Sequence, residues 1–163
     1  MRKLEKALAK DVLVLAVIPA LAGITVFPGL NADTKVLPRL QVIAADVNGA
    51  PGMEGHSDER EYVADLYLGF IASAKGMSEA DLDAYDERIS AVQAIFEEPG
   101  LTVLKGLLNF PAEEPDNRTV PDLYLYDVRF QNQSQDPLED KGQWQVLLHY
   151  HVEFKATDGQ PPA

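Results

Sequence analysis

The sequence has no cysteine, few basic residues and no long uninterrupted apolar run. With Cys at 0, disulfide frameworks, thiolate metal sites and a cysteine nucleophile are excluded. Lys+Arg number 14 against 26 Asp+Glu, a formal net charge of −12, so the chain lacks the basic surface that holds nucleic-acid phosphates. Nucleotide-binding, serine-hydrolase and zinc-protease motifs are also missing from the sequence.

What is present fits one globular domain. The 163 residues are 46% hydrophobic and 25% charged, the usual balance for a packed core with a solvated surface. We expect this domain to span residues 1–155 and to be followed by a flexible, proline-rich tail over 156–163.

The first 22 residues imitate a secretory signal, with a basic start and a small-residue site at Ala20-Leu21-Ala22. Glu5 and Asp11 interrupt the basic segment. Pro19 interrupts the apolar run, which is shorter than the roughly 20 residues needed to cross a bilayer. The 3–4 spacing of apolar residues from Leu4 to Ile18 favours an amphipathic helix that becomes buried.

Hydrophobic periodicity predicts five strands and two further helices. The strands are expected over 24–27, 40–47, 62–72, 123–130 and 143–155, and a short helix over 101–108. A capped helix is expected to begin at Ser78, with Asp81 three residues on. Its apolar stripe comprises Leu82, Tyr85, Ile89, Val92 and Phe96. This order predicts an α+β fold: a mixed or mainly antiparallel sheet of about five strands, with one N-terminal and one central helix packed on one face.

Two groups of residues are candidates for chemistry. His149, His151 and Glu153 alternate along a strand, so their side chains point the same way and could hold Zn²⁺ or Fe²⁺. The same three residues also fit the solvated face of an amphipathic strand. His56 lies among acidic residues on a glycine-rich loop and is a candidate general base. A flexible loop would not hold such a base in a fixed position.

Three polar loops, 48–61, 109–122 and 131–142, stand out more than any reactive group. Loops of about a dozen residues without structure of their own are usually binding elements or disordered. We therefore expect an interaction or assembly protein and not an enzyme, with no catalytic, cofactor-binding or metal residue assigned. The predicted interface residues are Glu54, His56, Asp58, Glu59, Arg60, Asp136, Glu139, Asp140 and Lys141.

Several segments are similar, in their order and in their local sequence, to those of a known family. They are the turn Val26-Phe27-Pro28-Gly29, the strand start 37–42, the strand 64–70, the capped helix 77–89 and the closing hairpin of 123–130 with 144–154. In this the chain resembles the tail terminators of lambda-type long-tailed bacteriophages, over most of its length. It departs from them in longer loops at 48–61 and 109–122 and in the tail after Lys155.

The resemblance implies a structural virion protein in the tail or neck, assembled in the bacterial host cytoplasm. Such a protein forms a homohexameric ring that caps the tail tube, ends tube polymerisation and presents the head-tail joining surface. The implied partners are copies of the same chain, the tube protein, a head-completion or neck protein, and a sheath protein if the tail contracts. The resemblance also implies that DNA passes through the ring without specific binding. It implies no membrane and no cofactor. Another neck or tail-completion protein, a generic interaction module, and a small metal-dependent enzyme using His149, His151 and Glu153 remain as alternatives.

Overall fold

A computed structural model describes residues 4–6, 8–9, 23–29, 36–49, 59–109, 123–138 and 142–157 of the chain. The elements are β1 (Thr25–Pro28), β2 (Arg39–Gly49), β3 (Glu59–Ser73), α2 (Glu79–Ile95), α3 (Gly100–Asn109), β4 (Leu123–Leu138) and β5 (Gln143–Thr157). The described residues among 4–9 are helical, and the remainder of the expected helix from Leu4 to Ile18 lies outside the described residues.

The five strands form one mixed sheet in the order β1-β2-β3-β5-β4, which confirms the expected α+β class. β1 runs parallel to β2, and the other neighbours are antiparallel. β3 and β5 are the inner two of the four long strands. They pair without interruption from Glu59 opposite Thr157 to Ser73 opposite Gln143. β5 thus runs two residues into the expected tail, because β3 supplies hydrogen-bonding partners to that point.

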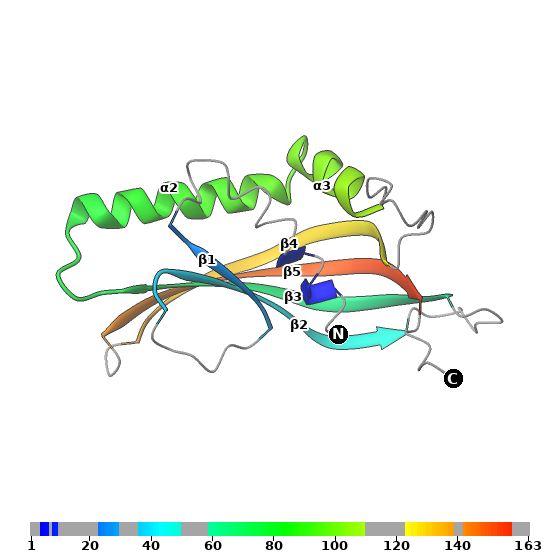
Figure 1. Ribbon diagram of the computed structural model, residues 1–163, viewed down its shortest axis with the longest axis horizontal. Coiled ribbons are helices and arrows are strands. Elements are labelled where there is room, and N and C mark those ends of the chain that lie inside the picture. The colour runs from blue at the N-terminus through cyan, green and yellow to red at the C-terminus, as the bar shows by residue number, and fades with distance from the viewer. Residues whose placement is uncertain are drawn as a thin grey trace, which may run out of the picture.

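Both longer helices lie on the same side of the sheet, with α2 along one half of its length and α3 over the other (Figure 1). The side chains that alternate along β3 and β5 point to this side and form the core, as the period of two requires. Leu66, Leu68, Val152 and Phe154 are fully buried there. Leu4 and Leu8 belong to the same buried cluster, so the N-terminal residues are part of the core. No helix in the described part of the chain combines the length and apolarity needed to cross a membrane.

The start of α2 is fixed by the local sequence. The Ser78 side chain accepts a hydrogen bond from the Asp81 amide, and the Asp81 carboxylate accepts one from the Ser78 amide, which completes the expected capping box. This backbone hydrogen bond lowers the pKa of the Asp81 carboxyl. The cap therefore stabilises the helix at neutral pH and weakens as acid protonates Asp81.

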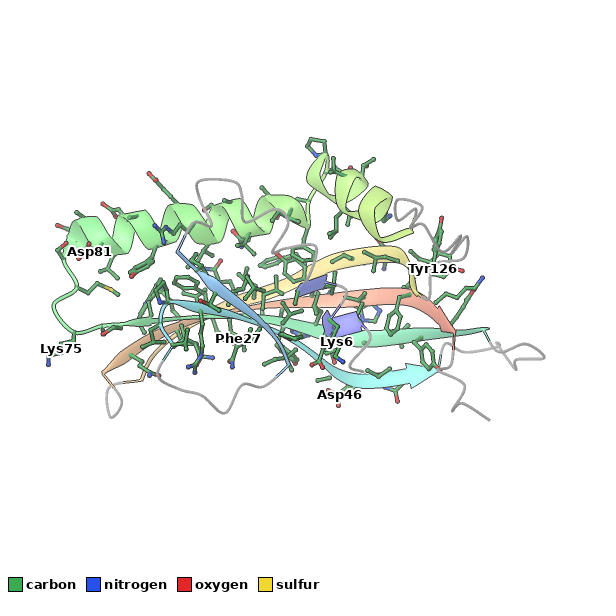
Figure 2. The ribbon with its side chains drawn as sticks, viewed as in Figure 1. Lys6, Phe27, Asp46, Lys75, Asp81 and Tyr126 are labelled. Carbon is green, nitrogen blue, oxygen red and sulfur yellow. The ribbon has the colours of Figure 1, made fainter. Side chains whose placement is uncertain are left out.

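The apolar stripe of α2 is shorter than expected. Ile89, Val92 and Phe96 are buried and Tyr85 is half-buried, but Leu82 is 39% exposed, so its assignment to the core was wrong. Leu82 lies in the first turn of α2, before the residues of the helix that contact the sheet. Figure 2 shows Asp81 at this outlying end of the molecule, with Tyr126 at the other. The core contact of α2 begins at Tyr85, whose ring lies 5.4 Å from that of Phe70.

The β2 edge of the sheet is protected in part by β1 and in part by Glu5. β1 pairs with β2 only as far as Val42, which leaves the outer edge of β2 without a strand beyond that residue in the described chain. There the buried Glu5 carboxylate accepts a hydrogen bond of 3.1 Å from the Ala44 amide. Buried backbone N–H groups need an acceptor, and an acidic side chain supplies it here. A register shift between Ala45 and Asn48 further interrupts this edge.

Candidate functional site

The predicted interface residues fall into three groups in the structure. Glu54, His56, Asp58, Glu139, Asp140 and Lys141 lie outside the described residues. Glu59 and Arg60 belong to β3, where they lie opposite Thr157 and Ala156. Asp136 belongs to β4, opposite Gln145. The expectation that these three residues lie in loops was therefore wrong.

The loop expected over 131–142 is mostly strand. β4 continues to Leu138 because β5 offers backbone partners along its whole length, and ladder hydrogen bonds override the loop-like composition. The loop expected over 48–61 is likewise shortened at both ends, by β2 to Gly49 and by β3 from Glu59.

The sheet separates the two sets of predicted interface residues. Glu59 begins β3, whereas Asp136 lies opposite Gln145, which in turn lies opposite Ile71 near the other end of β3. Twelve steps along a strand at about 3.3 Å each span about 40 Å. The strand ends at Gly49, Glu59 and Leu123 lie at one end of the sheet, and the β4–β5 connection lies at the other (Figure 1). Of the predicted interface residues, Glu59 and Arg60 thus lie near one end of the strands and Asp136 lies near the other.

The proposed metal-ligand set does not converge. His149 Nε2 lies 2.9 Å from Asp65 Oδ1, and its ring stacks on Tyr67 with centroids 4.5 Å apart. His151 Nε2 lies 4.0 Å from Glu153 Oε1, outside hydrogen-bonding distance. Within the described ranges, no group of three or more His, Asp or Glu side chains is arranged to hold a metal ion.

Asp65 and Tyr67 are site neighbours that sequence reasoning missed. Both lie on the face of β3 away from the helices, and Tyr67 stands opposite His149 in the register. The period-two alternation of β3 indicates that they share a face, but only the order of the strands reveals that this face meets His149. The arrangement is a cross-strand contact between a half-buried carboxylate and a half-buried imidazole.

We expect this contact to couple β3 to β5 measurably. In a double-mutant cycle of Asp65→Ala and His149→Ala, urea unfolding should give a coupling free energy of about 0.5–1 kcal/mol at pH 6. The control cycle pairs Asp65→Ala with His151→Ala, since His151 stands opposite Asp65 but lies nearer Glu153. Equal coupling in the two cycles would contradict the geometry.

On the helix side, β4 carries an exposed aromatic residue above a buried one. Phe130 is 45% exposed, and its ring meets that of Tyr150 edge-on at 5.6 Å. The ring of Tyr150 also lies 5.1 Å from Phe96, at the end of α2. The Tyr150 hydroxyl is fully buried and has no hydrogen-bond partner among the described residues, and burial raises its pKa. A hydroxyl in this setting is neutral and poorly placed to act as a base.

β4 is an edge strand, and two irregularities shape it. Relative to β5, it carries one extra residue at Tyr126 and another at Gln131. Tyr126 donates a hydrogen bond of 3.2 Å to Glu61, and Arg129 pairs with Asp127 at 2.7 Å. Burial and the nearby Glu61 carboxylate raise the pKa of Tyr126. From Arg129 to Gln135, every side chain is exposed.

No protein-family model matches the chain, and no curated protein matches it. Among solved structures, the chain is similar to one in the structure titled "Virion of native gene transfer agent (GTA) particle", with a TM-score of 0.44 and 13% sequence identity. The match covers 88% of this chain and 85% of the other.

Proposed function

We propose that the chain is a structural protein of a phage-like virion that caps the tail tube as a homohexameric ring, ends tube polymerisation and provides the head-tail joining surface. The supporting observation is the order of the elements: helical N-terminal residues, three strands, two helices and a closing hairpin. This is the order on which the sequence resemblance to tail terminators depends.

The shape of the sheet suits such a role. A closed ring built from one kind of subunit needs two different contact patches that meet head to tail. Glu59 and Asp136, two predicted interface residues in the described part of the chain, lie toward opposite ends of the strands, about 40 Å apart, so one end can face a neighbour or the tube while the other faces the neck. In this proposal the protein acts by binding and makes or breaks no covalent bond.

The charge of the chain suits a ring through which DNA passes. Each Lys or Arg contact to phosphate strengthens binding to DNA. A ring of subunits with a formal charge of −12 each would repel the backbone and allow it to slide. The partners in this proposal are the tube protein, a head-completion or neck protein, and a sheath protein if the tail contracts.

Electron microscopy of the purified protein in negative stain, with native mass spectrometry, tests the proposal. We expect rings of six copies, alone or at the ends of tubes formed by the tube protein of the same particle. A chain that stays monomeric in the presence of that tube protein would refute tail termination. Rings that carry about one tightly bound metal ion per chain, lost in His149→Ala, would instead favour the metal-dependent enzyme.

Charge reversal in each of the two predicted groups of interface residues tests those interfaces in the assembling particle. Glu54→Lys with Asp58→Lys, and separately Glu139→Lys with Asp140→Lys, should leave the circular dichroism spectrum unchanged and yield overlong tails or unjoined heads. Tails of normal length with unjoined heads in both variants would assign the chain to the neck instead. Normal particles from both variants would remove these residues from the interface.

A further inference from the structure

The outer edge of β4 is open between Asn132 and Gln135. β4 is the last strand of the sheet, and in the described part of the chain no strand lies beyond it. Its pairing with β5 is regular from Asn132 onward, after the extra residue at Gln131. A regular strand with an open edge presents backbone N–H and C=O groups that can pair with another strand.

The rest of the sheet boundary carries features that block such pairing. The β2 edge has β1, the Glu5 carboxylate at Ala44 and a register shift after Ala45. The first part of β4 has two extra residues and the charged pair of Asp127 with Arg129. Bulges and charges are the usual means by which proteins protect sheet edges. The segment 131–135 has neither charge nor proline.

The composition of this segment favours contact with another copy of the chain. Its sequence is Gln-Asn-Gln-Ser-Gln, five exposed and uncharged residues in a chain of net charge −12. Copies with so much negative charge repel each other least where they meet at a stretch without acids. The next residue, Asp136, is the acid that limits this neutral stretch.

We propose that the segment Asn132–Ser134 pairs antiparallel with the same segment of a second copy, about a twofold axis at Gln133. Successive residue pairs in an antiparallel ladder alternate between two kinds, so a symmetric pairing must place one residue opposite itself. With Gln133 at the axis, Asn132 faces Ser134, and the flanking residues Gln131 and Gln135 are also uncharged. An axis at Ser134 would instead set Asn132 against Asp136.

Gln133 is held in place for this role by α2. Its side-chain oxygen accepts a hydrogen bond of 3.0 Å from Gln93 Nε2. The contact is isologous, unlike the head-to-tail contacts of the proposed ring. It is also smaller than a standard interface, so the dimer it forms is weak and depends on concentration.

Charge substitution at the axis is the sharpest test, because it sets two like charges opposite each other. Sedimentation equilibrium of the full chain, at concentrations where no ring forms, should show a monomer–dimer equilibrium. Gln133→Glu and Gln133→Lys should each weaken it at least about tenfold, and an equimolar mixture of the two variants should restore it as a heterodimer. Ser90→Glu, on the exposed face of α2, is the control for the added charge and should leave the dimer unchanged.

Hydrogen exchange gives a second readout. The amides of 131–135 that point away from β5 should become protected as concentration rises in the wild type, and not in Gln133→Glu. A wild-type chain with no dimer at any soluble concentration, or a mixture that fails to restore it, would overturn the proposal. Rings that form equally well from Gln133→Glu, without a wild-type dimer, would overturn this contact and leave the proposed ring intact.

Discussion

Replacing Ile89 by aspartate is expected to destabilise the protein more than any other single substitution considered in α2. Ile89 is 3% exposed and belongs to the cluster between α2 and the sheet. The substitution removes a buried apolar side chain and puts a carboxylate in its place, at a cost of about 4 kcal/mol or more against the 5–15 kcal/mol that stabilises a typical domain. Thermal melting followed by far-ultraviolet circular dichroism measures the loss.

Leu82→Asp is the matched control, on the same helix and with the same change of charge. Because Leu82 is 39% exposed and precedes the contact with the sheet, we expect it to cost less than about 1 kcal/mol. Comparable losses of melting temperature in the two variants would mean that the first turns of α2 are buried after all. A stable Ile89→Asp variant would mean that α2 does not pack as described.

The second large effect is expected at Gly100, where α3 begins directly after the end of α2. A Cβ at this position would overlap the carbonyl oxygen of Ala94 and crowd Ile95 Cα at 3.1 Å. These neighbours are backbone atoms and cannot rotate away. Gly100→Ala must therefore displace α3, whose Leu101 and Leu104 are buried, at a cost of about 3 kcal/mol in urea unfolding.

Gly106 offers the control within the same helix. A Cβ there meets nothing within 4 Å, so Gly106→Ala gains the helix propensity of alanine without a clash. We expect it to stabilise the protein by up to about 1 kcal/mol. If both alanine variants shift stability in the same direction, the close approach of the two helices at Gly100 is wrong.

The features that sequence predicted correctly are those that local chemistry determines. The capping box of Ser78 and Asp81 depends on residues three apart, and the alternation of β5 from Val146 to Phe154 depends on one face meeting a core. The burial of Leu82 was wrong because periodicity gives the face of a helix and not the length over which that face has a neighbour.

Features that depend on distant partners could not be predicted in this way. The polar segment 131–135 has no apolar alternation, and it is a strand because β5 pairs with it. The contact of Asp65 with His149 joins residues 84 apart, and it required the order and register of the strands. Local sequence predicted the elements and their order, whereas tertiary pairing determined their lengths and the neighbours of the candidate site.

The hydrogen bond between Glu5 and Ala44 has a practical consequence for handling the protein. Trimming by a protease, or a fusion that pulls the first helix away, would strip the acceptor from that amide and leave β2 open to recruit foreign strands. Glu5 therefore protects this edge of β2 against intermolecular strand pairing and aggregation. Affinity tags therefore belong at the carboxyl end of the chain.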